Sequence, residues 1–201
     1  MGIGRTGRGM SNPLPQAFYY RPTLTVAREL LGCRLVRILE GERLSGIITE
    51  TEGYIGETDL GCHARVGRTP RTQVMYGPAG RAYVYFTYGM HWMLNAVTEA
   101  EGFPAAVLIR AIETEAGLSV VESRRKNVAA RNLTNGPAKL TLAFGIDSQQ
   151  NNIDLTNSDS GLWIEPGVVI PDSSVTIGAR VGLYSVPEPW KSIPWRFLAK
   201  R

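Results

Sequence analysis

The feature that most constrains the fold is the stretch RAYVYFTYGMHWMLNAVTEAEGFPAAVLIRAIE, residues 81–113. It contains three runs rich in β-branched and aromatic residues, at 82–87, 92–98 and 105–112, separated by two short turn-like segments. Runs of this length with glycine-containing turns between them are typical of neighbouring antiparallel strands. The stretch therefore predicts a three-stranded antiparallel meander, with its first turn at residues 88–91.

The rest of the chain alternates short predicted helices and strands. Helices are expected where a capping residue or an early proline precedes apolar residues at helical spacing; their ranges are 23–32, 117–126 and 135–144. Strands are expected where apolar and β-branched residues alternate or run together; their ranges are 33–39, 44–52, 161–165, 175–184 and 195–198. Residues 53–80 are predicted to be rich in loops. The expected fold class is mixed α/β with a mainly antiparallel sheet.

Composition bounds the class of protein. A chain of 201 residues that is 43% hydrophobic and 20% charged can bury a real core and suits one domain or a closely joined pair. Residues 1–17 are glycine-rich, interrupted by proline and without a secretory signal, so we expect a flexible N-terminal lead before a domain at 18–201. No apolar run approaches the about 20 residues that cross a bilayer, so no membrane partner is expected. The net charge of +4 allows a polyanionic partner without requiring one.

Cysteine and histidine usage argues against a metal or a disulfide framework. Cys33 and Cys62 are too few for either a disulfide scaffold or a zinc ribbon, and free thiols suit a reducing, cytoplasmic location. His63 and His91 are the sequence's two histidines, and neither falls in a metal-binding spacing. No P-loop, dinucleotide fingerprint or nucleophile elbow is present. We therefore expect no metal and no cofactor.

The segment TETEGYIGETDLGCH, residues 49–63, is the first candidate for chemistry. In a regular strand Ile48, Glu50, Glu52 and Tyr54 share one face, although Gly53 is able to break that regularity. A carboxylate beside an aromatic ring on an inward face can act as a base, because burial raises its pKa. The alternative is a pair of rim carboxylates that pair with arginines.

Aromatic residues are dense in the first hairpin of the meander. Tyr83 and Tyr85 share a face of their strand, and Tyr88 lies at the turn beside Gly89. An exposed aromatic ring at a hairpin tip is unfavourable in water unless it binds something, and minor-groove proteins insert such wedges between base steps. The alternative is a turn residue that folds back onto its own hairpin.

Five ordered blocks carry a family resemblance: TETEGYIGETDLGCHA, RTPRTQVMYGPAGRAYVYFTYGMHWMLN, AVLIRAIE, GPAKLTLAFGI and ARVGL. From about Tyr19 to Phe197 the chain resembles the alkyladenine DNA glycosylases, also called 3-methyladenine or methylpurine DNA glycosylases. The resemblance implies a single compact domain with a curved antiparallel sheet, flanking helices and a protruding β-hairpin. It also implies a monomer that acts on double-stranded DNA containing damaged purines, in the cytoplasm or at the nucleoid of a prokaryote.

The resemblance assigns roles to particular residues. Glu52 matches the family's general base, while Arg110 and the backbone carbonyl of Val181 match groups that help to hold the attacking water. The flipped base is expected between Tyr54 on one face and two residues on the other. The two residues on the other face are matched by His63 and Tyr85. Asn95 matches the residue at the pocket floor. Tyr88 matches the tyrosine of the hairpin wedge, with Met90 flanking it.

Several assignments stay open at this stage. The cations Arg68, Arg71, Lys139 and Arg180 are candidate phosphate contacts, and each is alternatively a solvated surface charge. Glu50 is interpreted as a supporting residue that orients Arg110 or another cation. Besides a monofunctional glycosylase, the sequence allows a damage-sensing DNA-binding module without catalysis, or a hydrolase of RNA or free nucleosides.

Overall fold

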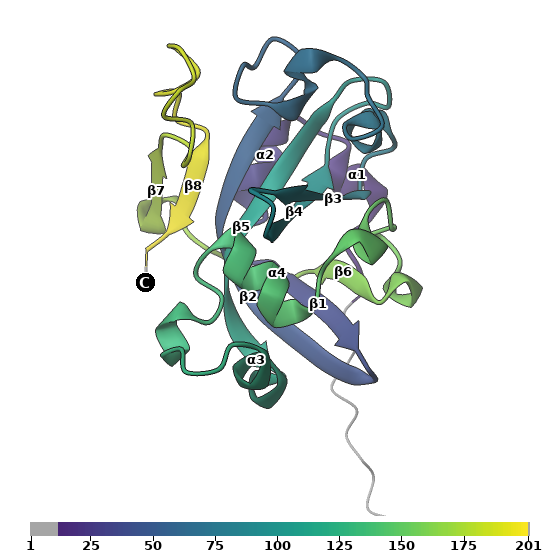
Figure 1. Ribbon diagram of the computed structural model, residues 1–201, viewed down its shortest axis with the longest axis vertical. Helices are drawn as coiled ribbons and strands as arrows, with labels where there is room; N and C mark the ends of the chain where they lie inside the picture. Colours follow the sequence, from purple (N-terminus) through teal and green to yellow (C-terminus); the bar gives the residue numbers. More distant parts are fainter. Residues whose placement is uncertain (1–11, 201) are drawn as a thin grey trace, which may run out of the picture.

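A computed structural model describes residues 12–200 and contains one eight-stranded sheet and four α-helices in that range (Figure 1). The helices are α1 (Gln16–Tyr19), α2 (Thr23–Glu29), α3 (Leu118–Arg124) and α4 (Pro137–Phe144). The strands are β1 (Arg34–Leu39), β2 (Glu42–Ile55), β3 (Ala82–Thr87), β4 (His91–Val97), β5 (Ala105–Ala116), β6 (Leu162–Glu165), β7 (Val175–Gly178) and β8 (Arg196–Ala199).

The sheet follows the order β3-β4-β5-β2-β1-β6, with β8 pairing both β2 and β7. Every strand pair in residues 12–200 is antiparallel. The predicted meander is present as β3-β4-β5, and the predicted hairpin at 33–52 is present as β1-β2. The α/β class and the antiparallel sheet are therefore confirmed.

The long strand β2 pairs with three other strands of the sheet. Its first half pairs with β1, its second half pairs with β8, and β5 runs along its other edge. Glu52 thereby lies between Leu108 of β5 and Arg196 of β8. The register of β2 against β5 shifts between Ile48 and Glu50 and again before Thr51, so the strand is not regular over this range. Such a bulge re-aims side chains where a site needs them.

The main core lies between the sheet and the helices. Val26 and Leu30, from α2 and its C-terminal end, and Leu140 and Phe144 of α4 are fully buried with Ile109 of β5. The apolar residues of both helices recur at helical spacing, which gives each helix one face to bury. A second, smaller cluster joins Cys62, Met75 and Tyr83 with neighbouring residues.

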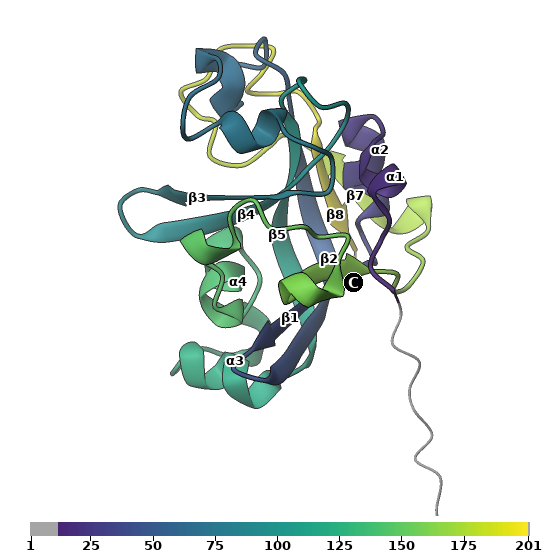
Figure 2. The ribbon, with the colours of Figure 1, turned by 90° about the vertical axis from the view of Figure 1, so that its right-hand side faces the viewer.

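The β3–β4 hairpin stands away from the body of the molecule (Figure 2). Its turn has Tyr88 at φ 53° and Gly89 at φ 68°, and the Met90 amide donates to the Thr87 carbonyl at 3.2 Å. Positive φ at two consecutive residues is a conformation that glycine adopts freely and tyrosine rarely does. The turn that the sequence placed here is confirmed, and it presents Tyr88 at the tip.

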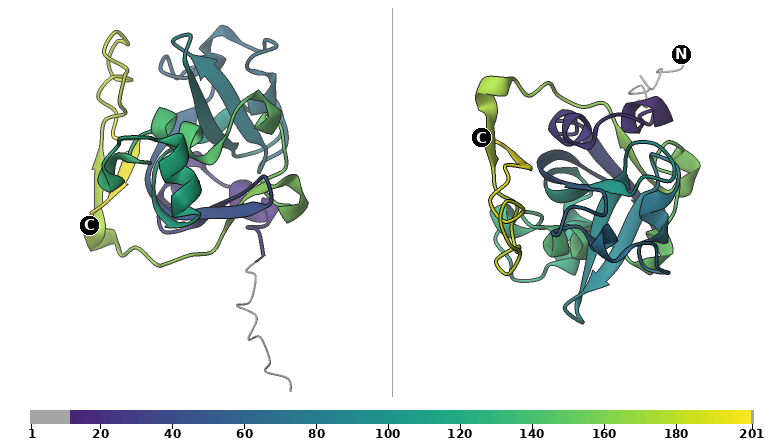
Figure 3. Two further views of the ribbon diagram at one scale, coloured as in Figure 1. Left: turned by 60° about the horizontal axis from the view of Figure 1, so that its bottom comes forward. Right: turned by 90° about the horizontal axis from the view of Figure 1, so that it is seen from above.

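Two predicted regions differ from the structure. The strand expected at 175–184 ends at Gly178, and residues 179–184 leave the sheet. Within the loop-rich region 53–80, β2 continues to Ile55, and 3₁₀ turns form at His63–Val66 and Gln73–Tyr76. Between β6 and β7 the chain runs around the outside of the molecule (Figure 3).

Part of the predicted N-terminal lead, residues 12–17, packs against the rest of the domain. Residues 1–11 of the expected lead lie outside the described range. Leu14, however, is 7% exposed in the main core, and its amide donates to the Ile164 carbonyl at 2.8 Å. Among residues 12–200, no helix has the length and apolar character needed to cross a membrane.

Gly32 fixes the junction between α2 and β1, and we expect Gly32→Ala to be destabilising. Its φ is +88°, and an added Cβ would lie 2.0 Å from the Val168 carbonyl oxygen. Strain and overpacking together predict a loss of roughly 2–4 kcal/mol in urea unfolding. Gly41→Ala is the matched control, because Gly41 has φ +84° with no heavy atom within 4 Å. Equal losses in both variants would contradict the steric part of this argument.

Candidate active site

A cavity of about 290 Å³ opens beside the hairpin, between the ends of the central strands and two loops. One loop carries Gly61–His63, and the other is the segment 181–183 that left the sheet after β7. Seven residues assigned from the sequence line this cavity: Tyr54, His63, Tyr85, Tyr88, Asn95, Arg110 and Val181. The fold thus brings together residues that are spread over most of the chain.

Glu52 lies behind the wall of this cavity with its side chain fully buried. Its Oε1 accepts the Val181 amide at 2.7 Å. Its Oε2 accepts the Tyr54 hydroxyl at 2.9 Å and the Arg110 Nη1 at 3.2 Å. All three donors line the cavity, so the carboxylate is one hydrogen bond from the cavity surface. The alternative of rim carboxylates paired with arginines holds for the pairing, since Glu52 contacts Arg110, but Glu52 is fully buried and does not lie at a rim.

Burial dominates the electrostatics of Glu52. Desolvation raises the pKa of its carboxyl above the ordinary value, while Arg110, the Val181 amide and the Tyr54 hydroxyl each act to lower it. A carboxylate with a raised pKa and hydrogen-bond donors on both oxygens is suited to accept a proton from water. The structure places Val181 at this site through its amide, which the sequence could not indicate.

Glu50 links two arginines next to Glu52. Its Oε1 accepts Arg110 Nε at 2.8 Å and Arg196 Nε at 2.6 Å, and it is 8% exposed. Because Arg110 also donates to Glu52, Glu50 fixes the orientation of the guanidinium that faces the cavity. The interpretation of Glu50 as a supporting residue agrees with this geometry. The part played by Arg196 was missed, because β8 lies far from β2 in the sequence.

Aromatic rings form the body of the cavity. His63 and Tyr85 meet edge to face with their centroids 4.4 Å apart, and the Tyr83 ring packs near both. The His63 Nδ1 and the Tyr83 hydroxyl form a hydrogen bond of 3.0 Å, which fixes the imidazole. The Asn95 amide donates to the Tyr83 carbonyl at 3.0 Å, so Asn95 is held across the hairpin with only 3% exposure.

His63 is held neutral. Desolvation, together with the positive charges of Arg71 and Arg65, lowers its pKa to about 4. A neutral imidazole packs against Tyr85 without the cost of a buried charge, and it can either donate or accept a hydrogen bond. At neutral pH the ring therefore acts as a flat, polar-edged wall of the cavity.

The hairpin tip is open to solvent. Tyr88 is 77% exposed and Met90 is 67% exposed, and Tyr88 also contributes to the cavity lining. The alternative of a tyrosine folded back onto its own hairpin is wrong. Met90 lies at the tip rather than in the cavity lining, beside the tyrosine that it was expected to flank.

Three of the four candidate phosphate contacts are accessible, and one is not. Arg68 and Arg71 are exposed, and Lys139 is half-buried with its Nζ donating to the exposed Asn135. Arg180 is 4% exposed and forms a buried ion pair with Asp59. Its assignment as a phosphate contact is therefore wrong, because the guanidinium points inward and is already neutralised.

Other lining residues were not singled out from the sequence. They are mostly apolar, and they close the cavity rather than carry charge: Met75, Met93, Leu108, Pro137 and Leu183. Their only sequence signal is membership of predicted strands or loops, which does not separate a cavity wall from a core. Among residues 12–200, no group of three or more His, Cys, Asp or Glu side chains is arranged to hold a metal ion.

The fold and the cavity define a single-domain α/β protein with an aromatic pocket built against a buried, ionisable carboxylate. A family model described as "Methylpurine-DNA glycosylase (MPG)" matches residues 17–201. Relatives named "Putative 3-methyladenine DNA glycosylase" include one from Carboxydothermus hydrogenoformans, 44% identical over 93% of this chain and 95% of its own length. Another, from Myxococcus xanthus, is 46% identical over 92% of this chain and 89% of its own length. The chain belongs to the methylpurine-DNA glycosylase family.

The low pKa of His63 predicts a pH-dependent stability. Because the folded pKa of about 4 lies below the ordinary 6.5, the unfolded chain binds this proton first as the pH falls. The contribution of His63 to stability is complete above pH 6.5, falls between 6.5 and 4, and is fully lost below 4. Urea unfolding across this window should show a smaller acid loss for His63→Gln than for the wild type. Parallel stability curves for the two proteins would contradict a neutral, buried His63.

Proposed function

We propose that the protein is a monofunctional DNA glycosylase that hydrolyses the N-glycosidic bond of alkylated or deaminated purines. Its substrates are the class that includes 3-methyladenine, 7-methylguanine, hypoxanthine and ethenoadenine in duplex DNA. The observation that carries this proposal is the placement of fully buried Glu52 against the wall of an aromatic cavity of about 290 Å³. A base stacked in a duplex must be extruded before it enters such a cavity, at a cost of a few kcal/mol.

The proposed reaction uses Glu52 as the base. A water held where Tyr54, Arg110 and Val181 meet attacks C1′ of the sugar, and Glu52 accepts its proton. The transition state resembles an oxocarbenium ion, which the Glu52 carboxylate also stabilises electrostatically. Hydrolysis releases the free base and leaves an abasic site with both strands intact. The Val181 amide, which donates to the second oxygen of Glu52, fixes the carboxylate while the proton is transferred.

The aromatic cavity selects the base. A cationic alkylated purine between Tyr54 on one side and His63 with Tyr85 on the other gains a cation–π attraction of roughly 0.5–2 kcal/mol. Alkylation on a ring nitrogen also makes the purine a better leaving group. Asn95 is fixed by its hydrogen bond to the Tyr83 carbonyl. It is proposed to lie at the floor and to clash with the 2-amino group of a normal guanine.

The exposed hairpin tip is proposed to occupy the gap that the extruded nucleotide leaves. Tyr88 is the most exposed large apolar residue of the tip and also lines the cavity, so it is positioned to contact both the DNA and the base in the cavity. Arg68, Arg71 and Lys139 are proposed to contact backbone phosphates around it, which positions the protein without reading sequence. The protein is proposed to act on the duplex as a monomer.

The role of Glu52 is tested by Glu52→Gln. This change keeps the shape of the side chain but removes the base, so single-turnover release of a methylated purine should fall by roughly 10²–10⁴-fold. Binding to lesion duplex, measured by fluorescence anisotropy, should change little. Released bases are quantified by mass spectrometry.

Glu165→Gln is the matched control for Glu52→Gln. Glu165 is also a buried carboxylate, 2% exposed, paired with Arg34 and Arg43 but remote from the cavity lining. Its excision rate should equal that of the wild type. An unchanged rate in Glu52→Gln, or an equal loss in both variants, would refute Glu52 as the base.

The role of Tyr88 is tested with duplex and single-stranded substrates that carry the same lesion. Tyr88→Ala removes the group that fills the gap, so duplex excision should fall by at least about tenfold, in line with extrusion costs of a few kcal/mol. Excision from the single strand, which needs no wedge, should be nearly unchanged. Tyr20→Ala is the control, because Tyr20 is 60% exposed beside α1, away from the hairpin. Equal losses on both substrates would argue against a wedge.

A further inference from the structure

A second buried ion pair lies behind the cavity and takes no part in the reaction proposed above. Arg180 Nη1 and Nη2 donate to the two carboxylate oxygens of Asp59 at 2.5 and 2.8 Å, and both side chains have no exposed surface. Arg180 also donates to the carbonyls of Gly53 at 3.1 Å and Trp190 at 3.3 Å. The two terminal nitrogens of Arg180 are therefore hydrogen-bonded, while its buried Nε has no hydrogen-bond partner among the described residues.

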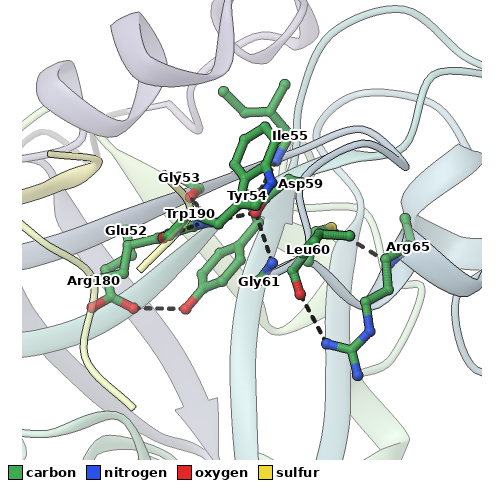
Figure 4. A network of polar contacts seen from close by, with 12 residues as sticks. Glu52, Gly53, Tyr54, Ile55, Asp59, Leu60, Gly61, Arg65, Arg180 and Trp190 are labelled. Atoms are coloured by element: carbon green, nitrogen blue, oxygen red, sulfur yellow. Dashed lines mark hydrogen bonds and ion pairs between the residues drawn. The ribbon is translucent and has the colours of Figure 1, made fainter. Parts of the chain in front are cut away.

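The guanidinium of Arg180 stacks against Tyr54. It lies 4.7 Å from the centroid of the Tyr54 ring and 5.0 Å from that of Trp195. Tyr54 lines the cavity and Arg180 does not, so the cation covers the ring face that is turned away from the cavity. Figure 4 shows Tyr54 at the centre of this network, with its hydroxyl directed to Glu52.

Asp59 holds the turn that leads to His63. Its carboxylate accepts the amides of Gly61 at 2.9 Å and Ile55 at 3.3 Å, and its carbonyl accepts the Cys62 amide at 2.8 Å. The turn packs tightly on the pair, since a Cβ at Gly61 would lie 2.8 Å from the Arg180 Nη2. The residue after Arg180 is Val181, whose amide fixes Glu52.

We infer that the Asp59–Arg180 pair is a positioning and specificity element, which sets both walls of the base slot and keeps the charge behind Tyr54 neutral. This inference rests on the proposed function. The pair joins three parts of the site: the back of Tyr54, the turn before His63 and the Val181 amide. Asp59 and Arg180 touch no reacting atom and act only through these neighbours.

The neutrality of the pair matters for the substrate. A cationic purine on the cavity face of Tyr54 would be repelled by an unpaired guanidinium on the opposite face, in an interior where screening by water is weak. Asp59 cancels that charge, so the ring is free to attract a cation. A neutral purine such as hypoxanthine does not sense this difference to the same degree.

The variant Asp59→Asn tests this specificity role. It keeps the shape of the side chain and leaves Arg180 uncompensated behind Tyr54. The single-turnover rate for 7-methylguanine, divided by that for hypoxanthine in a matched duplex, should fall roughly tenfold from the wild-type ratio. The double variant Asp59→Asn with Arg180→Gln removes both charges, and it should return the ratio toward the wild-type value even if both rates are low.

Asp172→Asn is the control, because it removes an equivalent carboxylate from the exposed pair that Asp172 forms with Arg28. Its ratio should match the wild type. A proportional loss of both activities in Asp59→Asn, with an unchanged ratio, would show that the pair only stabilises the fold and would overturn the specificity role.

A second measurement is independent of activity and applies to the same double variant. The Glu52 carboxyl is titrated by ¹³C NMR, with its signal identified by its loss in Glu52→Gln. Glu52 accepts hydrogen bonds from the Val181 amide, from Tyr54 of β2 and from Arg110 of β5. The other charged groups close to it are Glu50 of β2 and Arg196 of β8, which pairs with Glu50. Removing a neutral pair leaves the net charge around Glu52 unchanged.

A shift in the double variant therefore reports the position of the Val181 amide. Because that hydrogen bond lowers the pKa of Glu52, loosening it should move the titration to higher pH. An unchanged or lower titration midpoint of Glu52 in the double variant would overturn the positioning role. This test remains decisive even where Asp59→Asn alone fails to fold. If the wild type releases neither base, the proposed function fails, while the Glu52 titration still decides whether the pair positions the site.

Discussion

The site depends on burying one ionisable carboxylate without leaving it unsatisfied. Removing a carboxylate from water costs several kcal/mol unless donors and a compensating charge replace its hydration. Glu52 receives these from three places: a hydroxyl on its own strand, a guanidinium on β5 and an amide at residue 181. No single element supplies more than one of them. The long strand β2, its pairing with β5 and β8, and the departure of the chain from the sheet after β7 are all required to satisfy this one group.

The same requirement explains the balance of charge around the cavity. Glu50 and Glu52 are matched by Arg110 and Arg196, and the deeper pair is neutral by itself. Each of these carboxylates is hydrogen-bonded to an arginine, so the interior carries little net charge. The hydrogen bonds also fix the direction of each side-chain dipole. Fixed dipoles of this kind stabilise charge that develops in a reaction without a cost of reorganisation. Arg65, Arg68 and Arg71 are exposed on the surface, where a polyanion can meet them.

Local patterns predicted much of this architecture, and distant pairings explain the rest. The meander and its turn were predictable, because alternation and turn residues act over a few positions, and Tyr88 followed from the turn. The inward orientation of Arg180 was not predictable, because its partner Asp59 lies 121 residues away in the sequence. Arg196 and Glu50 are 146 residues apart. The strand expected at 175–184 was overextended for the same reason: its second half is held by Glu52 and Asp59, not by a neighbouring strand.

The pocket and the hairpin solve opposite physical problems. The rings of Tyr54, His63 and Tyr85 are fixed by hydrogen bonds and by neighbouring cations. A flat ligand that enters between them therefore orders few side chains, and the entropic cost of binding is small. The tip keeps large apolar surface in water and places a tyrosine at positive φ, which costs stability in the free protein. That cost is recovered only when the exposed ring is buried by a partner. A rigid cavity next to an exposed aromatic ring therefore suits a ligand that fills the cavity and covers the ring at the same time.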